Sequence, residues 1–390
     1  VQDHVQEVIA GIAPHDSQER FEALGVRVIR APAAFSDAST VVAGGEEIRA
    51  RRFVIATGSR PAVPPIPGLD DVDYLTNETV FANRTAPERL VVIGAGPIGL
   101  ELAQAHRRLG CEVVVLEAAT PLANEDPELV PVVLEALARD GVEVVAQAKV
   151  SRVARAGKAI EVTFTRDGES ATVTGSHLLV ATGRAATVEG LGLEAAGIVY
   201  TKTGISVDAG LRTSNRRVYA IGDVTGGPQF THVASYHAGL VIRSALFGLP
   251  ARASNHHIPR VTFTDPELAH VGLTEAEARS RGGTVSVLRS RFADNDRARA
   301  ERRTEGLIKV VAGRRGRILG ASIVGPGAGE LIMPWNLAIS SRLTLKAMVD
   351  TVVAYPTLSE ISRSAAMSHY SGLTDNPWVR RVIGVVKWFR

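Results

Sequence analysis

The feature that most constrains the fold is a glycine pattern, Gly-x-Gly-x-x-Gly, set between an apolar run and a helical pattern in Leu90–Glu117. The apolar run predicts a buried strand, and the residues after the glycines predict an amphipathic helix that leads to a second buried strand. Glu117 ends that second strand. A glycine pattern alone is weak, but one that follows a strand, opens a helix and precedes a carboxylate by roughly twenty residues is typical of a dinucleotide-binding βαβ unit.

Each glycine has a physical role in such a turn. Gly94 permits the tight turn, Gly96 lets the backbone approach a pyrophosphate, and Gly99 lets the helix lie close to the strand. The N–H groups at the helix start, around Ile98, then face the phosphates with the helix dipole behind them. The alternative is a plain βαβ turn that binds nothing.

The residue at the end of the second strand predicts the choice of cofactor. The Glu117 carboxylate can accept hydrogen bonds from both ribose hydroxyls, and it would repel a 2′-phosphate. Ala118 and Ala119 follow it, so no arginine stands there to bind such a phosphate. We therefore expect NAD(P)H as a cofactor, with NADH favoured.

The composition is that of an ordinary globular protein. The chain has 390 residues, 45% hydrophobic and 22% charged, which predicts more than one domain. It contains no apolar run near the length of a membrane span and opens on no secretory signal, so a cytoplasmic location is expected. The net charge is +3 and the basic residues are scattered without interleaved aromatic residues, which argues against nucleic-acid binding.

Cys111 is the single cysteine of the chain. One cysteine can form neither an intrachain disulfide nor a cysteine-based metal site, and no metal site is predicted. Its position between a helix and the strand leading to Glu117 is typical of a buried apolar thiol.

Two short passages repeat. Phe53–Arg60 and Leu178–Arg184 are both apolar strands that end in Ala-Thr-Gly, and each follows a segment with the pattern of a polar β-meander, Val26–Arg49 and Val142–Thr174. The repetition indicates two nucleotide-binding modules of related design; the alternative is two unrelated strand ends. The candidate cofactor-binding residues in these passages are Thr57, Gly58 and Gly183.

Simpler patterns mark the rest of the chain. Proline-rich Arg60–Gly68 predicts an irregular linker between domains. Thr231–Phe247 predicts a helix. Ile258–Val324 predicts strands with one helix, Thr274–Arg281, which opens on a capping box, and the remainder is predicted to be helical.

Several motifs together resemble those of the FAD-dependent pyridine nucleotide–disulfide oxidoreductases, the family of dihydrolipoamide dehydrogenase, glutathione reductase and mercuric reductase. The resemblance covers essentially the whole chain, and Gly222–Phe230 looks most like the mercuric reductase branch. The motifs that carry it are the glycine pattern, the two Ala-Thr-Gly passages, Tyr219–Asp223, Phe263–Glu267 with Val271–Thr274, and Tyr355–Glu360.

The resemblance implies roles for further residues. Gly222 and Asp223 stand at a strand tip, where the carboxylate can hydrogen-bond a ribityl hydroxyl of FAD. The helix that begins near Thr231 and His232 would aim its N–H groups at the flavin, and Glu101 matches a family glutamate close to nicotinamide and flavin. A turn carboxylate without a ligand and a simple helix cap are the alternatives for Asp223 and His232.

The chain departs from the family pattern at its start. Family members begin with a second glycine fingerprint for FAD and a Cys-x-x-x-x-Cys redox pair, whereas this chain starts with Val1 in what reads as the helix that follows them. We therefore expect it to be N-terminally incomplete. A fragment, a misplaced start or missing residues would each produce this pattern.

Two further positions also differ. Tyr355 stands where dihydrolipoamide dehydrogenase and glutathione reductase have a histidine acid/base oriented by the residue matching Glu360. Mercuric reductases carry tyrosine there, but they end in a cysteine pair that this chain lacks; its nearest downstream histidine is His369. Pro97 replaces a tyrosine that shields the flavin in several relatives, so gating of that type is not expected. Tyr355 and Glu360 are the candidate catalytic residues.

These observations predict an α/β fold with two related three-layer nucleotide-binding domains and an α/β dimerisation domain. The expected modules are a partial FAD module at residues 1–86, an NAD(P) module at 87–183, the rest of the FAD module at 184–254 and an interface domain at 255–390. By resemblance the interface domain forms a twofold homodimer that places Glu360 of one chain against the flavin site of the other.

The expected function is hydride transfer from NADH to FAD and on to a disulfide, thiol or metal-type acceptor. The alternatives are an NADH dehydrogenase, or diaphorase, without a thiol step, and a non-catalytic NAD-binding remnant that lacks FAD. The last segment, Pro377–Arg390, predicts a short basic amphipathic helix. It would either pack on the interface domain or make a weak contact with an anionic membrane surface.

Overall fold

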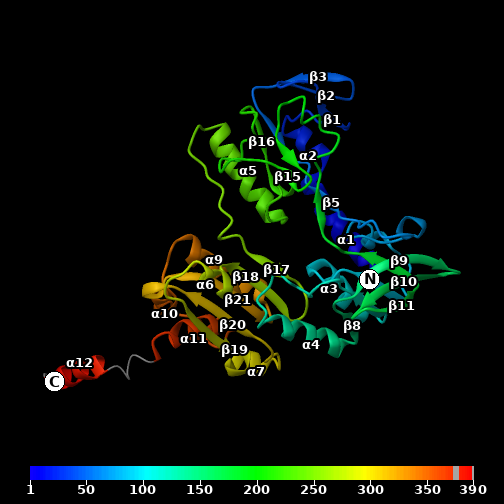
Figure 1. Ribbon diagram of the computed structural model, residues 1–390. Helices are drawn as coiled ribbons and strands as arrows, with labels where there is room; N and C mark the ends of the chain where they lie inside the picture. Colours follow the sequence, from blue (N-terminus) through cyan, green and yellow to red (C-terminus); the bar gives the residue numbers. More distant parts are fainter. Residues whose placement is uncertain (372–376, 389–390) are drawn as a thin grey trace. The chain divides into compact units, whose positions relative to one another are not determined.

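The computed structural model describes residues 1–371 and 377–388 of the chain, which has a mixed α/β fold (Figure 1). The chain divides into two compact units, each made of two segments. Unit 1 contains Val1–Gly94 and Val150–Asn255, and unit 2 contains Ala95–Lys149 and His256–Arg390. Each unit is described by itself below.

Unit 1 opens with helices and a three-stranded antiparallel meander. The helix predicted at the start of the chain is present, and the Ser17 hydroxyl caps the next helix by accepting a hydrogen bond from the Arg20 N–H. The meander predicted over Val26–Arg49 is shorter than expected, because its strands occupy only residues 33–49. The elements are α1 (Gln2–Ile12), α2 (Gln18–Ala23), β1 (Ala33–Phe35), β2 (Thr40–Ala43) and β3 (Glu46–Arg49).

The two Ala-Thr-Gly passages end strands of unit 1. The first follows β4 (Phe53–Ile55), which pairs in parallel with β16 (Val218–Ala220), and the second follows β12 (His177–Val180), which pairs in parallel with β6 (Arg89–Ile93). Leucine, valine and isoleucine are the buried residues of β6 and β12, as expected of parallel strands covered on both faces. Further strands of the unit are β9 (Lys149–Ala156), β10 (Ala159–Arg166) and β11 (Glu169–Gly175) in the order β11-β10-β9, and β14 (Tyr200–Thr201) with β15 (Gly204–Ile205).

The interpretation of Arg60–Gly68 as wholly irregular was wrong at its first residues. β5 (Ser59–Pro61) pairs antiparallel with β13 (Arg184–Ala186), although the segment is rich in proline. Proline is tolerated here because it ends a two-stranded ribbon and its missing N–H breaks no ladder. The helix predicted from Thr231 is present as α5 (Thr231–Ala245) and ends slightly before the expected Phe247.

The first segment of unit 2 contains α3 (Pro97–Arg108), β7 (Glu112–Leu116), α4 (Val130–Asp140) and β8 (Val142–Val145). β7 and β8 pair in parallel, as the helical connection between them requires. Pro97 occupies the first turn of α3, where its missing N–H costs nothing. Cys111, directly before β7, is buried as predicted.

The second segment of unit 2 is built on a five-stranded antiparallel sheet in the order β17-β18-β21-β20-β19. The prediction of a single helix within Ile258–Val324 was wrong: α7 lies there as well as α6, and the Asn295 side chain caps α7 by accepting from the Ala298 N–H. The strands are β17 (Arg260–Thr262), β18 (Glu267–Gly272), β19 (Ser286–Arg291), β20 (Leu307–Ala312) and β21 (Ile318–Gly325). The helices are α6 (Glu275–Ser280), α7 (Asp296–Ala300), α8 (Ala328–Leu331), α9 (Met333–Ser340), α10 (Leu345–Asp350), α11 (Glu360–Ser368) and α12 (Pro377–Trp388).

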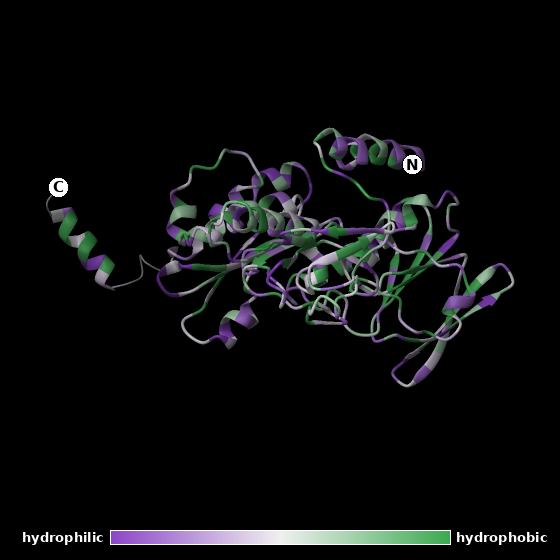
Figure 2. Cartoon of the chain, turned by 90° about the horizontal axis from the view of Figure 1, so that it is seen from above, coloured by the Kyte–Doolittle hydropathy of each residue, from purple (hydrophilic) through white to green (hydrophobic). Residues whose placement is uncertain are grey.

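The C-terminal helix predicted over Pro377–Arg390 is present as α12, although residues 389–390 lie outside the described residues. Hydrophobic and hydrophilic residues alternate along it (Figure 2). Val385 is 58% exposed and Val386 is exposed too. Within residues 1–371 and 377–388, no helix is long and apolar enough to cross a membrane.

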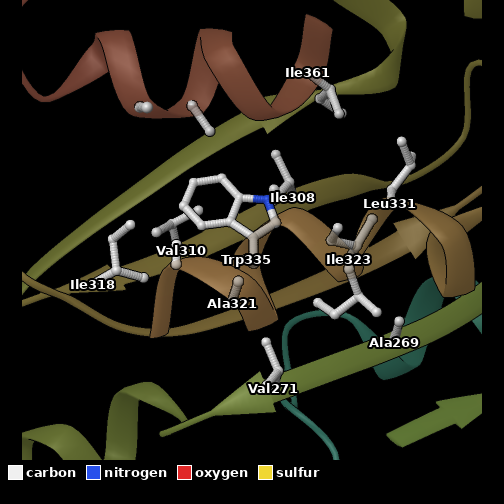
Figure 3. Close-up of a cluster of buried hydrophobic side chains, with 14 of the residues drawn as sticks. Ala269, Val271, Ile308, Val310, Ile318, Ala321, Ile323, Leu331, Trp335 and Ile361 are labelled. Carbon is white, nitrogen blue, oxygen red and sulfur yellow. The ribbon is translucent and has the colours of Figure 1, made fainter. Parts of the chain in front are cut away.

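Trp335 on α9 is the centre of the core around the five-stranded sheet (Figure 3). Its ring is fully buried among Ile308, Val310 and Ala321 of the sheet, and its Nε1–H donates to the Ser362 hydroxyl at 3.0 Å. Removing such a ring costs about 3–5 kcal/mol of stability. The core therefore joins α9 and α11 firmly to the sheet.

Candidate functional site

The glycine turn begins where β6 ends. Gly94 has φ +106°, and a Cβ atom there would lie 2.5 Å from the carbonyl oxygen of Ala181, so no other residue fits. Gly96 faces open space, since a Cβ atom added there would meet nothing within 4 Å. Ile98 and Gly99 follow in the first turn of α3, and Gly99 is buried. The turn thus has the tight bend and the uncovered backbone that the sequence predicted.

Glu117 folds back onto this turn. Its carboxylate accepts hydrogen bonds from the Ala95 N–H at 2.7 Å and from the Ala119 N–H at 2.8 Å. A carboxylate has about four acceptor positions, so these two bonds orient the group and leave acceptor capacity for a ligand. The side chain is therefore fixed beside the turn before any ligand arrives.

One face of α3 contacts the loop between β17 and β18. Glu101 accepts a hydrogen bond from the Phe263 N–H at 2.8 Å, and Gln104 accepts from the Asp265 N–H at 2.7 Å. Arg108 makes an ion pair with the Asp265 carboxylate at 2.9 Å. Burial raises the pKa of Glu101, although the Phe263 N–H opposes the shift. Sequence reasoning selected Glu101 alone and missed Gln104 and Arg108, which share its helix face by their three- and four-residue spacing.

A second polar cluster lies in unit 1, where β5 meets β13. The Ser59 hydroxyl donates to Asp223 Oδ2 at 2.5 Å, and Arg184 Nε donates to the Ser59 hydroxyl at 2.7 Å. Arg184 also lies 3.9 Å from the Asp223 carboxylate. We call Ser59, Arg184 and Asp223 the open cluster, because its charged side chains remain about one-fifth exposed, 21% for Arg184 and 19% for Asp223.

The open cluster explains the sequence repeat. Ser59 and Arg184 are the residues that follow the two Ala-Thr-Gly passages, and pairing of β5 with β13 brings them together. The passages also bond each other's flanks: Gly58 O accepts from the Thr187 N–H, and Gly183 O accepts from the Ala62 N–H. The Thr57 hydroxyl donates to the Thr187 carbonyl at 2.8 Å. Sequence reasoning selected Gly58 and Gly183 and missed Ser59 and Arg184, which follow them. The repeated Ala-Thr-Gly was the signal that could have pointed to these two side chains.

Three predicted residues lie on either side of Asp223 in the chain. Gly222 has φ +68° and is buried in the turn that ends β16. Thr231 and His232 are exposed in the first turn of α5, and the His232 ring stacks on Phe230 with centroids 5.2 Å apart. The turn and the helix start therefore belong to the same unit as the open cluster.

Tyr355 and Glu360 lie in unit 2, before and at the start of α11. The Tyr355 side chain is 71% exposed, and its hydroxyl donates to Asp296 Oδ2 at 3.2 Å. This hydrogen bond raises the pKa of Tyr355, so the phenol keeps its proton at neutral pH and is even less available as a general base than the sequence suggested. Glu360 accepts a longer hydrogen bond from the Thr357 N–H at 3.4 Å. It lines a small cavity of about 140 Å³ together with Asp294 and Asp296.

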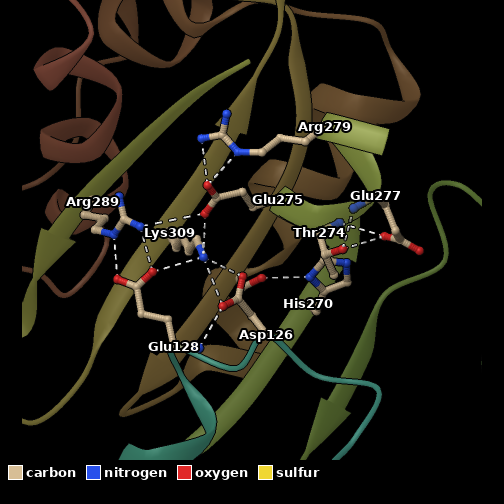
Figure 4. Close-up of polar contacts among 10 residues, drawn as sticks. Asp126, Glu128, His270, Thr274, Glu275, Glu277, Arg279, Arg289 and Lys309 are labelled. Atoms are coloured by element: carbon tan, nitrogen blue, oxygen red, sulfur yellow. Dashed lines mark hydrogen bonds and ion pairs between the residues drawn. The ribbon is translucent and has the colours of Figure 1, made fainter. Parts of the chain in front are cut away.

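The third polar cluster of the chain lies in unit 2, and the sequence did not predict it (Figure 4). Lys309 of β20 lies 2.9 Å from the Asp126 and Glu275 carboxylates and 3.0 Å from the Glu128 carboxylate. Arg289 of β19 adds a second cation on Glu128, whose pKa falls to about 2, chiefly through this hydrogen bond. We call these five residues the closed cluster, since Lys309 is 5% and Asp126 2% exposed.

Comparison with known proteins places these features in a family. Residues 7–238 match the pyridine nucleotide-disulphide oxidoreductase family, and residues 258–366 match the dimerisation domain of the same family. The chain is 38% identical over 347 residues to a mercuric reductase from Bacillus cereus, covering 88% of this chain and 55% of the relative. It is 37% identical over 349 residues to a dihydrolipoyl dehydrogenase from Geobacillus stearothermophilus, covering 87% and 74%.

Solved structures agree with the sequence comparison. LpdA from Mycobacterium tuberculosis superposes with a TM-score of 0.85 at 28% identity, covering 94% of this chain and 82% of that one. The HOCl-induced flavoprotein disulfide reductase RclA from Escherichia coli superposes with a TM-score of 0.80 at 28% identity, covering 87% and 79%. The chain spans 55% and 63% of the length of two mercuric reductases that it matches, from Bacillus cereus and Lysinibacillus sphaericus. Because both of its parts match, the chain belongs to the pyridine nucleotide-disulphide oxidoreductase family.

Proposed function

We propose that this chain is part of a flavoenzyme that uses NADH to reduce a disulfide, thiol or metal-type acceptor. The observation that carries the proposal is the open cluster, in which two repeated strand ends bring Ser59 and Arg184 to Asp223. Such an arrangement orients a carboxylate at the tip of a strand, where nucleotide-type ligands of α/β folds bind. Family membership supports FAD and NAD(P)H as the cofactors.

The residues of the open cluster fit FAD. Asp223 uses Oδ2 for Ser59 and is partly exposed, so the carboxylate retains capacity to accept a ribityl hydroxyl. Gly222, Thr57, Gly58 and Gly183 would hold the nearby backbone, and the first-turn N–H groups of α5 at Thr231 and His232 would favour negative charge on the bound group. FAD, when bound, supplies the redox chemistry by taking hydride from NADH and passing the electrons on.

The glycine turn fits NADH better than NADPH. Two backbone N–H groups hold the Glu117 carboxylate beside the turn. It can accept ribose hydroxyls there and repel a 2′-phosphate. Gly94, Gly96, Ile98 and Gly99 would hold the pyrophosphate through the turn and the start of α3, with Glu101 further along the same helix.

The dimerisation-domain match supports a homodimer. We propose that Tyr355 and Glu360 serve the partner's site in this dimer. A protonated, exposed Tyr355 can donate a hydrogen bond to a bound acceptor, and Glu360 can accept one. In this proposal they orient the acceptor, and neither acts as a strong base at neutral pH.

One observation favours a second candidate, an NADH dehydrogenase without a thiol step. Cys111, the single cysteine of these 390 residues, is buried, and burial raises its pKa. A buried thiol with a raised pKa is a poor redox nucleophile. A thiol step would therefore depend on cysteines outside these residues, whereas reduction of quinones or dyes would not.

A simple experiment separates the candidates from a remnant that binds NAD without FAD. The purified chain is examined for the yellow flavin spectrum, then mixed with NADH under anaerobic conditions. Yellow protein that NADH bleaches supports a flavoenzyme, and thiol or dye acceptors then separate the two candidates. Colourless protein that still binds NADH overturns the flavoenzyme proposal for these residues. Asp223→Ala serves as the control that should lose the colour while NADH still binds.

We also propose a cytoplasmic protein whose C-terminal helix makes a weak contact with anionic membranes. The exposed Val385 and Val386 lie on a helix that also carries Arg381 and Lys387, and each such cation contributes roughly 1 kcal/mol near an anionic surface. The test is co-sedimentation with anionic liposomes at low salt, comparing the full chain with one that ends at Asn376. If both remain in the supernatant, the membrane contact is refuted.

A further inference from the structure

A buried histidine that the proposed chemistry does not use lies behind the Gly222–Asp223 turn. His237 is on α5 and is 4% exposed. Its Nδ1 atom lies 3.2 Å from the backbone nitrogen of Gly222, which donates the hydrogen bond. A side chain thus satisfies a buried N–H group that leads directly into the carboxylate of the open cluster.

The turn packs closely against the same helix. Gly222 has φ +68°, and a Cβ atom there would come within 3.0 Å of the Ala234 Cβ atom. Ala234 and His237 are three residues apart and therefore share one face of α5. The rest of the turn is also bonded: the Ile221 N–H donates to the Ile55 carbonyl at 3.0 Å, and the Gly222 carbonyl accepts from the Thr225 hydroxyl at 2.8 Å.

The hydrogen bond requires one form of the imidazole ring. Nδ1 accepts a proton only when it carries none, so the ring must be neutral with its hydrogen on Nε2. Protonation would place an N–H group against the Gly222 N–H. Burial lowers the pKa of His237, which keeps the ring neutral. The titratable groups next to it are Tyr236, whose ring centroid lies 5.8 Å away on the same helix, and Asp223, which follows Gly222.

Asp223 is therefore held from two directions. Ser59 and Arg184 hold its carboxylate from the β5–β13 ribbon, and His237 holds the backbone before it from α5. We infer that His237 is a positioning residue, which fixes the Gly222–Asp223 turn so that the carboxylate presents its free acceptor positions to a polyhydroxylated chain such as the ribityl group of FAD. The inference rests on the proposed function for the identity of the ligand and on the hydrogen bond for the mechanism.

Three variants test the role of the acceptor atom. His237→Asn places an amide oxygen close to the position of Nδ1, His237→Gln moves the oxygen one carbon further out, and His237→Leu removes the acceptor. The dissociation constant for FAD should stay within about threefold of the wild-type value in His237→Asn. It should rise by about tenfold in His237→Gln and His237→Leu, the typical effect of losing one hydrogen bond to a buried group. If His237 acted only through packing, FAD binding would instead weaken to a similar extent in all three variants.

Two readouts need no bound flavin. Nitrogen chemical shifts of the His237 ring in the full chain should show an unprotonated Nδ1 and a hydrogen on Nε2. Hydrogen exchange of the Gly222 amide should be slow in the wild-type chain and in His237→Asn, and at least about tenfold faster in His237→Leu, since exchange reports local opening. A third readout does use FAD. The FAD affinity of the wild-type chain should fall only in acid, once the pH reaches the lowered pKa of His237, whereas that of His237→Asn should not fall there.

The outcomes separate this inference from the proposed function. A hydrogen on Nδ1, or an unchanged Gly222 exchange rate in His237→Leu, overturns the positioning role whether or not FAD binds. If FAD binds to none of the proteins while the exchange pattern is as expected, the histidine positions the turn and the flavin assignment is wrong. Equal FAD affinities for the Asn, Gln and Leu variants would also refute the inference.

Discussion

The closed cluster around Lys309 and the open cluster around Asp223 both bring arginine or lysine to carboxylates, but they differ in exposure. Lys309 and Asp126 are 5% and 2% exposed, while Arg184 and Asp223 are 21% and 19% exposed. In the closed cluster three carboxylates surround one ammonium group, so its hydrogen-bond donors are used within the chain. In the open cluster a hydroxyl group fixes one carboxylate oxygen and leaves the other available. Complete pairing indicates a structural role, and partial pairing with exposure indicates a ligand site.

The physical reason is the cost of removing a charge from water. A buried charge is tolerated only when partners replace its lost hydration, so taking away one partner is far more costly than taking away an exposed group. The comparison therefore predicts that substitutions in the closed cluster change stability and those in the open cluster change binding. Four measurements can break or sharpen it.

The largest effect is expected for Lys309→Met. It leaves the buried Asp126 carboxylate without its cation, which costs about 3–5 kcal/mol of the free energy of unfolding. Urea titration measures this, and Lys346→Met is the matched control, because Lys346 is an exposed lysine paired with Asp350 on one helix. The free energy of unfolding of the control should stay close to that of the wild-type chain. A loss below about 1 kcal/mol for Lys309→Met, the size of a surface ion pair, would remove the distinction between the clusters.

The next effect is a dependence of stability on pH through His270, which lies beside the closed cluster. Burial lowers the pKa of His270 to about 4, and its ring bonds the Ser322 hydroxyl and the Gly272 carbonyl. Below pH 6.5 the unfolded chain takes up a proton that the folded chain refuses, so stability falls between pH 6.5 and pH 4 by up to about 3 kcal/mol. Urea titrations at pH 7 and pH 5 measure the slope, and His270→Gln should flatten it. A wild-type protein equally stable at both values would contradict the assignment.

Asp223→Ala tests the open cluster. It should weaken FAD binding by about 10- to 100-fold, the range for losing a hydrogen bond to a charged group, with little change in the free energy of unfolding. Flavin fluorescence and urea titration together separate the two effects. A loss of stability as large as that of Lys309→Met would mean that the open cluster is structural as well.

The smallest effect is expected at the glycine turn. Glu117→Ala should narrow the preference for NADH over NADPH by about tenfold, or ~1.5 kcal/mol, because a charge-assisted contact to ribose is lost. Stability should change little, since the carboxylate is only partly buried. Steady-state kinetics with both cofactors measures the ratio. Equal kinetics with NADH and NADPH in the wild-type protein would refute the role given to Glu117.

How far the sequence could predict these sites depends on how far apart their residues lie. The glycine turn and Glu117 belong to one continuous segment whose periodicity encodes strand, turn and helix, and the structure has them as expected. The open cluster needs β5 to pair with β13, and only the repeated Ala-Thr-Gly hinted at that meeting. The roles of the selected residues and the four module boundaries stay predictions.

The closed cluster was beyond sequence reasoning for a different reason. Lys309 lies inside the apolar strand β20. Because side chains alternate between the two faces of a strand, a single lysine there would be interpreted as facing solvent. Its partners come from the loop before α4 and from α6, far away in the chain. The short helix α7 was missed because five residues carry too little periodicity to stand out, even with the cap at Asn295.

The burial of Lys309 has a consequence for covalent labelling. The chain contains only six lysines, at positions 149, 158, 202, 309, 346 and 387. An amine-reactive reagent needs an uncharged, accessible amine, and Lys309 offers neither, because its three carboxylates raise its pKa and cover it. Acylation of Lys309, read by mass spectrometry after digestion, would therefore proceed only while the loop that carries Asp126 and Glu128 has separated from the sheet. The rate at which the peptide that contains Lys309 gains mass would therefore measure how often this loop separates from the sheet, without any substitution in the chain.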